Sequence, residues 1–354
     1  MEFQITELKK RELLKTCGIP IIDDSTNYWF VRTSAGEHFE DFYFGEYIAI
    51  GWDKLNDIES LKCSTKEKLK DDVIKLYSDD SRPGNTAAQI LKFVNDMKIG
   101  DYILIPNASC ERIAVGLVIS DVYLYEPTEQ DKLDVLFDGV ELDFLKRRNV
   151  QWITKAPLRR CQLDPMLVPI IYSYGTIVDA NPYSQFINRS IYDLYYKSGE
   201  LHAIFNMTRP EDISAYYFNK FINSIFETQK LCTTITETDF SPDDFVIKAS
   251  FNSAGPVEMI TGAISAMLVL SSISLFINGA NIKFKYNIFG FFKGQFNISS
   301  SGLLDKIKEF KNIEKQHKDS LDKINSDLIE AKNNLEIKGK NVLKEDPINQ
   351  DAQS

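Results

Sequence analysis

Two similar stretches, Tyr47-Ile-Ala-Ile-Gly-Trp52 and Arg112-Ile-Ala-Val-Gly-Leu117, decide the fold of the first half of the chain. Each is a short run of β-branched and other apolar residues with a glycine near its end, which is typical of a strand. We interpret them as two strands of one small barrel rather than as tandem repeats. Their glycines are expected to end or bend the strands near a ligand. Only the first stretch offers an aromatic ring there, because Leu117 occupies the position that matches Trp52.

Other strand-like runs surround this pair, at residues 28–32, 102–105 and 150–153, and Gly, Pro, Asp or Asn clusters bound most of them. Two helical stretches interrupt the strands, at about residues 65–77 and 85–97. The fold class predicted for this part of the chain is therefore α+β, a small β-barrel with helices.

Length and charge narrow the functional classes. The chain has 354 residues, enough for two domains, and its formal net charge of −10 argues against a surface coated for indiscriminate nucleic-acid binding. Any nucleic-acid site must then be a local patch. The five cysteines form no Cys-x-x-Cys pair and indicate reduced thiols in a cytoplasmic setting. Three widely spaced histidines give little support to a zinc site, and we predict neither a metal nor a cofactor.

The second half of the chain changes character after Pro165. Met259–Ile277 contains no charged residue, and as a helix it would be about 28 Å long, close to the hydrocarbon thickness of a bilayer. Residues 282–298 alternate apolar and polar side chains around two glycines, like a hairpin. A heptad-like spacing from Leu303 to Leu335 indicates either self-association or a helix packed on its own domain. We accordingly divide the chain into an N-terminal helix (1–25), the barrel domain (26–165), an α/β connector and effector domain (166–256), a transmembrane helix with a hairpin (257–300), a coiled-coil-like helix (301–340) and a disordered tail (341–354).

The segment from Tyr28 to about Leu163 resembles the EVE/PUA-like domain found at the N-terminus of some Mrr-type restriction enzymes. The matching residues, in order, are Trp29-Phe-Val-Arg32, Gly36-Glu37, Ile48-Ala-Ile-Gly-Trp52, Asp57, Gly84-Asn85 with Gln89 and Phe93, Ile99-Gly-Asp101, Ile113-Ala-Val-Gly116, Tyr123 with Tyr125, and Val150-Gln-Trp152 followed by Arg159-Arg160. The resemblance implies a barrel with an aromatic pocket that holds a nucleobase, often a modified or flipped-out one.

A base outside its stack needs a flat apolar face and hydrogen-bonding groups at its edge. The side chains that can supply faces are Trp29, Trp52, Tyr123 and Trp152. Edge or phosphate contacts can come from Arg32, Asn85 and Gln89. Residues 146–160 add six basic residues and no acid, which fits a phosphate track; the arginines of this run are Arg147, Arg148, Arg159 and Arg160.

Each of these residues also has an ordinary structural interpretation. Trp29 and Trp152 lie in strand-like runs and can belong to the barrel core, and Trp52 can be core or pocket. Asn85 can simply cap the helix that it opens, and Gln89 can be an ordinary exposed helix residue. The basic run can be a solvated loop.

The sequence contains no convincing catalytic constellation. Asp327 with Glu336-Ile-Lys338 imitates the acid and Glu-x-Lys pattern of metal-dependent nucleases, but it falls on the heptad-like tail, where charges usually face solvent. A P-loop, a Gly-x-Ser-x-Gly motif and a Cys/His pairing are all missing from the sequence. We therefore expect a protein that is not an enzyme and has no catalytic residues.

The uncharged span carries small residues at a spacing suited to helix packing, Gly262, Ala263 and Ala266, which favours a transmembrane helix over a buried soluble one. Lys283 and Lys285 follow the span and favour a cytoplasmic C-terminal side, which conflicts with a cytoplasmic N-terminal domain. Either the hairpin-like region returns through the membrane, or the helix inserts only when it is released.

A sensor domain followed by a membrane module resembles the HalA-type effectors of Hailong anti-phage systems. Domain order and the features around Ala254-Gly-Pro-Val-Glu-Met259 carry this resemblance. It implies a membrane toxin that forms a homo-oligomer, with a tetramer as our expectation, and that is held inactive by single-stranded DNA oligomers from a partner nucleotidyltransferase.

From these features we expect a DNA-sensing membrane effector, or ion channel, of bacterial anti-phage defence. It would act at the inner membrane with its N-terminal domain in the cytoplasm, and conditional insertion would keep it soluble before activation. The alternatives are a soluble reader of modified bases or nucleic acid that recruits another protein through its heptad-like tail, and a nuclease subunit.

Overall fold

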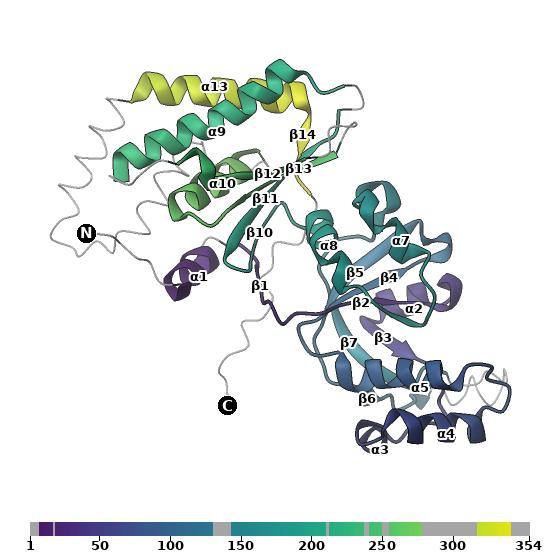
Figure 1. Ribbon diagram of the computed structural model, residues 1–354. Helices are drawn as coiled ribbons and strands as arrows, with labels where there is room; N and C mark the ends of the chain where they lie inside the picture. The colour runs from purple at the N-terminus through teal and green to yellow at the C-terminus, as the bar shows by residue number, and fades with distance from the viewer. Residues whose placement is uncertain are drawn as a thin grey trace. The chain divides into compact units, whose positions relative to one another are not determined.

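The chain folds into two compact units in a computed structural model (Figure 1). The structure describes residues 7–16, 18–129, 143–209, 212–236, 241–249, 255–277 and 317–340. Unit 1 combines Met1–Asp24 with Tyr192–Lys340, and unit 2 contains Ser25–Ile191. The chain therefore leaves unit 1 after its first helix and strand, builds unit 2, and then returns.

Unit 2 is built on one curled sheet that forms a half-barrel. The strand order is β3-β7-β5-β4-β2-β9, where the strands are β2 (Tyr28–Val31), β3 (Tyr47–Ile50), β4 (Tyr102–Pro106), β5 (Arg112–Val118), β7 (Lys146–Trp152) and β9 (Ile177–Asp179). Two short strands lie off this path: β6 (Tyr123–Leu124) pairs with β7, and β8 (Leu158–Arg159) pairs with β5. β2 and β4 run parallel, and the other pairs are antiparallel. The α+β class is confirmed, and the sheet is a half-barrel whose path ends at β3 and β9.

The two stretches that decide this fold lie on either side of β7. Their glycines differ in role. Gly51 follows β3 in open space, so an added Cβ would meet no atom within 4 Å. Gly116 lies inside β5, where an added Cβ would come within 2.4 Å of Val150 Cγ1 and 2.7 Å of Trp152 Cε3. Gly116 is required because the side chains of β7 pack directly against its backbone.

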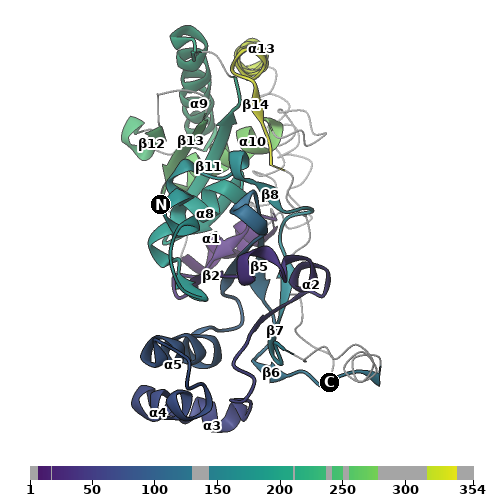
Figure 2. The same cartoon turned by 90° about the vertical axis from the view of Figure 1, so that its right-hand side faces the viewer.

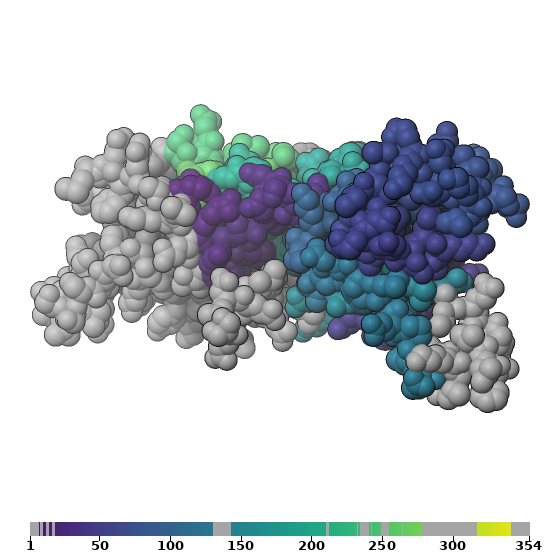
Figure 3. All heavy atoms as spheres, turned by 90° about the horizontal axis from the view of Figure 1, so that it is seen from below, coloured from purple at the N-terminus to yellow at the C-terminus, as the bar shows by residue number. Residues whose placement is uncertain are grey.

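Helices close the core of unit 2. The first group contains α3 (Ile58–Lys62), α4 (Lys66–Leu76) and α5 (Pro83–Leu91), and α5 continues into a π-helical turn at Lys92–Asp96. These helices lie together in Figure 2 and form a continuous deep-blue part of the surface in Figure 3. Thr65 caps α4, because its side chain accepts a hydrogen bond from Lys68 N. The remaining helices of this unit are α2 (Phe39–Phe44), α7 (Val168–Ile171) and α8 (Ser184–Ile191).

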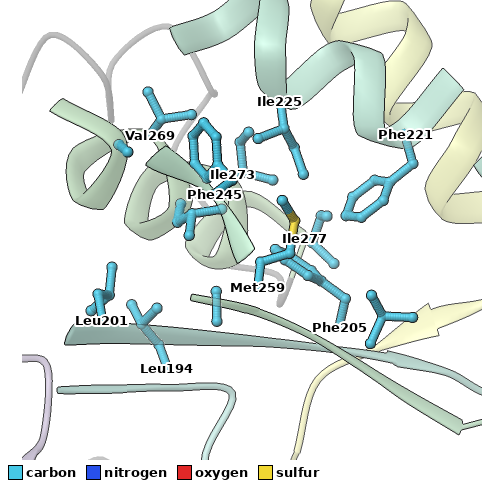
Figure 4. Close-up of a cluster of buried hydrophobic side chains, with 14 of the residues drawn as sticks. Leu194, Leu201, Phe205, Phe221, Ile225, Phe245, Met259, Val269, Ile273 and Ile277 are labelled. Atoms are coloured by element: carbon cyan, nitrogen blue, oxygen red, sulfur yellow. The ribbon is translucent and has the colours of Figure 1, made fainter. Parts of the chain in front are cut away.

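Unit 1 has a second sheet, covered by helices on one face. The strand order is β1-β10-β11-β13-β12, where the strands are β1 (Ile21–Ile22), β10 (Leu194–Lys197), β11 (Glu200–Met207), β12 (Val246–Ala249) and β13 (Gly255–Thr261), and β14 (Ile337–Lys338) pairs with β11. The helices are α1 (Glu7–Thr16), α9 (Ala215–Thr236), α10 (Ile264–Ile277) and α13 (Lys318–Leu335). Figure 4 shows side chains of the sheet, such as Phe205 and Met259, meeting those of α9 and α10 in one buried cluster.

The boundary between the units lies elsewhere than the sequence predicts. We expected the first domain to end at residue 165, but the unit extends to Ile191 because β9 pairs with β2 and completes the sheet. The N-terminal helix also has a different place, since β1, which follows it, pairs in parallel with β10 of unit 1. Both differences come from strands of two or three residues, which are too short to give a periodic signal.

The uncharged span Met259–Ile277 is not one helix. Met259–Thr261 form the end of β13, and α10 has 14 residues, which is about 21 Å of helix. Every residue from Ala266 to Ser274 is buried, so α10 is apolar on all sides because it lies inside the core of unit 1. Within the described ranges, no helix has both the length and the apolar character needed to cross a membrane, and the predicted transmembrane helix is not confirmed. The predicted hairpin at residues 282–298 falls outside the described residues.

The second part of the heptad-like pattern corresponds to α13, while its first part, from residue 303 to 316, and the predicted tail at 341–354 fall outside the described residues. The side chains of the pattern on α13 are buried, from Leu321 to Leu335, and the helix packs beside α9 of the same unit (Figure 1). Lys220 of α9 binds Asp327 at 2.9 Å and Glu330 at 2.6 Å, and these carboxylates raise the pKa of the lysine, Glu330 most strongly. Of the two interpretations left open, packing on its own domain is the one seen for α13. Asp327, one residue of the nuclease-like pattern, is paired with a lysine here.

Candidate nucleic-acid interface

The basic run of residues 146–160 does not form a continuous track. Its first half is strand β7, in which successive side chains point to opposite faces of the sheet. The side chains of Lys146 and Arg148 therefore point inward, where they are 0% and 2% exposed, while Arg147 between them is half-buried. Charges that adjoin in the sequence are separated by the strand, so only part of the run can meet a ligand.

Arg148 is a buried anchor. Its guanidinium donates from Nε to Phe93 O at 2.9 Å, from Nη2 to Val94 O at 3.1 Å and from Nη1 to Ser120 O at 3.1 Å. Two of these acceptors belong to the π-helical turn that ends α5, where carbonyls have no further helical partner. Burial lowers the pKa of Arg148, and the carboxylates of Asp121 and Asp101 oppose this shift. The predicted role of Arg148 in binding nucleic acid is corrected to that of a structural cap.

Lys146 holds the backbone at the end of β3. Its Nζ donates to Trp52 O at 3.0 Å and to Asp53 Oδ1 at 3.3 Å. Asp53 also accepts from the backbone N–H groups of Phe144 and Leu145, both at 2.9 Å. Burial lowers the pKa of Lys146, and the Asp53 carboxylate acts in the opposite direction. This ion pair between a buried lysine and a partly buried aspartate joins the end of β3 to the start of β7.

Trp52 has a strained backbone in this corner. Its φ is +60°, in the left-handed region that costs about 1–3 kcal/mol for a bulky residue. Its indole is half-buried and packs against the core of unit 2. The bond from Lys146 to the Trp52 carbonyl stabilises this conformation. Of the three tryptophans, Trp52 alone keeps a partly exposed ring, and its role as a base-stacking residue stays a prediction.

The other two tryptophans are core residues. Trp29 is 5% exposed, and its Nε1 donates to Asp101 Oδ2 at 2.8 Å. Trp152 is 8% exposed, and its Nε1 donates to Tyr43 O at 2.7 Å. Both rings therefore have their faces covered and their single donor satisfied. The structure favours the core interpretation of these two residues over a nucleobase pocket.

Arg32 and Gln89 hold the segment that leads into β9. Nη2 of Arg32 donates to Ile171 O at 2.7 Å and to Ser173 O at 2.5 Å. Gln89 is buried, and its Oε1 accepts from Ile177 N at 2.5 Å. These hydrogen bonds attach this segment to the sheet and to α5, which argues against the edge or phosphate contacts predicted for Arg32 and Gln89.

Asn85 lies on the exposed side of the first turn of α5. It does not cap the helix, because Arg82 occupies the N-cap position and the Asp80 carboxylate accepts from Arg82 N at 2.7 Å and from Thr86 Oγ1 at 2.5 Å. The side chain of Asn85 is therefore available at the surface, and its predicted contact with nucleic acid stays a prediction.

Tyr123 and Arg147 lie together in a stack of cation and aromatic groups. The guanidinium carbon of Arg147 is 4.2 Å from the ring centre of Tyr47 and 3.5 Å from that of Tyr125. Tyr123 pairs with Arg147 across β6 and β7, and its hydroxyl donates to Asn149 Oδ1 at 2.7 Å. Burial raises the pKa of Tyr47 and of Tyr123, while the Arg147 charge opposes both shifts. Arg147 is thus half-buried, with its guanidinium in contact with the rings of two tyrosines.

Arg159 and Arg160 line an open pocket of about 310 Å³, which we call the arginine pocket; its lining residues are Glu111, Arg112, Arg159, Arg160 and Cys161. The sheet explains this grouping. β8 pairs with β5 so that Arg159 lies opposite Arg112, and Arg160 N donates to Glu111 O at 2.8 Å. All five residues of the lining are exposed.

The arginine pocket has a surplus of positive charge. Over the described ranges, the side chains of Arg112, Arg159 and Glu111 make neither a hydrogen bond nor an ion pair. Arg160 donates to the hydroxyl of Tyr172 at 3.0 Å and lies 5.5 Å from the centre of that ring. Tyr172 is itself 63% exposed, and Tyr174 nearby in the sequence is 97% exposed. The pocket can therefore bind an anion and has an aromatic ring at its side.

The predicted site residues thus separate into two surface regions and a set of anchors. Arg112 begins β5, whereas Tyr123 and Arg147 lie beyond the other end of this strand. Because β5 has seven residues, its two ends are about 20 Å apart. One nucleobase pocket cannot include both regions. The prediction missed Arg112 and Tyr172, because their proximity to Arg159 and Arg160 depends on the pairing of β8 with β5 and on the course of the chain after it.

Comparison with known proteins gives one match. The profile of a domain family described as a domain of unknown function (DUF8426) matches residues 29–165, which is less than half of the chain. The matched region runs from β2 to the residues just before α7 and contains the whole arginine pocket. No curated protein and no solved structure matches the chain.

Proposed function

We propose that unit 2 is a nucleic-acid-binding module and that the arginine pocket binds its phosphate groups. One observation carries the proposal: three guanidinium groups, two of them without a partner among the described residues, line one open pocket on a chain whose net charge is −10. In an acidic protein, such a local surplus of positive charge supports an anionic ligand.

The aromatic side chain beside the arginines favours nucleic acid over a simple anion. Proteins that bind single strands combine positive groups along the backbone with rings on which bases stack. Tyr172, which accepts a hydrogen bond from Arg160, offers such a ring next to the phosphate-binding groups. The resemblance of residues 28–163 to EVE/PUA-like domains supports the same class of ligand. We also propose that Trp52, whose half-buried ring follows the end of β3, contacts a base.

An effector role for unit 1 is a further proposal. In that proposal, single-stranded DNA made by a partner nucleotidyltransferase restrains the protein, and loss of the DNA allows unit 1 to disrupt the membrane. A membrane step would have to release α10 from the core, where its residues 266–274 are buried. Leakage of dye from liposomes, measured with and without DNA, tests this step; intact liposomes in both states would exclude it.

Binding of a fluorescent oligonucleotide, followed by anisotropy at fixed salt, tests the main proposal. Arg159→Gln removes one charge from the pocket, and Lys155→Gln removes one exposed charge from the same basic run outside the pocket. We expect Arg159→Gln to weaken binding about tenfold and to reduce the salt dependence by about one phosphate contact. Lys155→Gln should retain nearly full affinity. Equal affinities of the two variants would refute the assignment of the pocket.

A further inference from the structure

The size of the arginine pocket limits what it can hold. Its volume of about 310 Å³ lies at the lower end of the range for small-molecule sites, which is about 300–1,000 Å³. A pocket of this size fits roughly one nucleotide and not a run of several. The ligand that fits this pocket is therefore a single phosphate with its neighbouring sugar and base.

The charges of the lining match a doubly charged anion. Arg112, Arg159 and Arg160 contribute three positive charges and Glu111 one negative charge, which leaves a surplus of two. An internal phosphodiester carries one negative charge, whereas a phosphate monoester carries about −1.5 to −2 at neutral pH and has three strong acceptor oxygens. Guanidinium groups bind such oxygens in pairs through their planar fork of donors.

The arrangement of the three arginines agrees with this match. Arg112 and Arg159 lie on adjacent strands in a register that places them opposite each other, and the donors of their guanidinium groups have no partner among the described residues. Arg160 is held by the hydroxyl of Tyr172, whose exposed ring lies beside the pocket. A phosphate between the guanidiniums would leave the adjoining base close to an aromatic face.

We propose that the arginine pocket takes the terminal phosphate monoester of a nucleic-acid strand in preference to an internal phosphodiester. This inference rests on the proposed function, because it names the part of the nucleic acid that the same pocket recognises. A 5′ phosphate, a 3′ phosphate and a free nucleoside monophosphate present the same group, so the experiment must separate these three sources.

The test measures binding of the full-length protein to one single-stranded sequence in three forms, with a 5′ phosphate, with a 3′ phosphate and with hydroxyls at both ends. A nucleoside monophosphate serves as competitor. We expect one phosphorylated form to bind at least tenfold more tightly than the unphosphorylated strand. That preference should disappear in Arg159→Gln and in Arg112→Gln and remain in Lys155→Gln, which keeps the pocket intact.

The possible results separate the two proposals. Equal binding of all three strands, reduced by Arg159→Gln, would overturn the preference for a terminal phosphate and leave the nucleic-acid function standing. A preference that survives in Arg159→Gln would place the terminal phosphate elsewhere and also overturn the inference. A nucleoside monophosphate that displaces the phosphorylated strand would support recognition of the single terminal nucleotide. Failure of every strand to bind would overturn the proposed function itself.

Discussion

Replacement of Arg148 by methionine should destabilise unit 2 strongly. The guanidinium is 2% exposed and donates three hydrogen bonds of 2.9–3.1 Å to backbone carbonyls. A hydrogen bond to a charged group contributes about 1.5–3 kcal/mol, and a buried acceptor left without its donor costs about 1–3 kcal/mol. The contributions of the three hydrogen bonds are not additive, and the unbranched side chain of methionine still fills part of the space of the arginine. We therefore expect the free energy of unfolding to fall by about 3–5 kcal/mol.

Urea denaturation followed by tryptophan fluorescence measures the unfolding of unit 2, because all three tryptophans lie in that unit. Arg159→Met, at an exposed position, is the matched control and should change the free energy of unfolding by less than about 0.5 kcal/mol. If Arg148→Met does not fold, Arg148→Lys, which keeps the charge and one donor group, should fold with intermediate stability. A loss below about 1 kcal/mol in Arg148→Met would refute the anchoring role.

Packing and burial also determine how three other substitutions should affect stability. Gly116→Ala should lower the stability measured by thermal denaturation by about 1–3 kcal/mol, whereas Gly51→Ala, in open space, should change it by less than about 1 kcal/mol. Equal effects would contradict the packing of β7 on β5. Leu270→Ala should lower the free energy of unfolding by about 2–5 kcal/mol, and Leu275→Ala, at a half-buried position, should lower it clearly less. Similar losses in the two variants would argue against α10 as a core helix. Burial raises the pKa of Asp193 above 3.8, so the folded state keeps a proton that the unfolded state loses. The stability of the protein relative to Asp193→Asn should therefore fall as the pH rises from about 4 through the raised pKa. A difference in melting temperature that is constant with pH would exclude this linkage.

The strands of unit 2 could be predicted because their signal is local. The stretches around Ile48 and Ile113 are continuous runs of β-branched and other apolar residues, and both form strands of the same sheet. The difference between Gly51 and Gly116 could not be predicted, because it depends on which strand packs beside each of them. The same limit applies to β9, whose three residues give no periodic pattern but extend unit 2 by more than twenty residues.

The apolar span shows a second limit of the sequence. A helix buried on all sides in a protein core and a helix in a bilayer have the same apolar composition, so hydropathy alone cannot separate them. The distinction here comes from the division of the span at Gly262, between strand β13 and a helix of only 14 residues. Small residues in the span, such as Ala266, pack inside unit 1.

The candidate site was predictable only in part, for reasons of geometry. Arg159 and Arg160 were predicted as basic surface residues, and they line the arginine pocket. Arg148 belongs to the same run in the sequence, but the alternation of β7 turns it into the core. Arg112 is more than forty residues from Arg159 and meets it only through strand pairing, which a single sequence does not reveal.

The assignment of the arginine pocket as the binding site is tested by the affinity of full-length Arg112→Gln for a single-stranded oligonucleotide, compared with Lys155→Gln at the same salt concentration. Arg112 enters the site only through the structure, since it lies outside the basic run and joins the pocket by its register with Arg159. Arg112→Gln should weaken binding about as much as Arg159→Gln, roughly tenfold, while Lys155→Gln binds like the unaltered protein. Unaltered affinity of the Arg112→Gln variant would show that the arginine pocket is not the binding site.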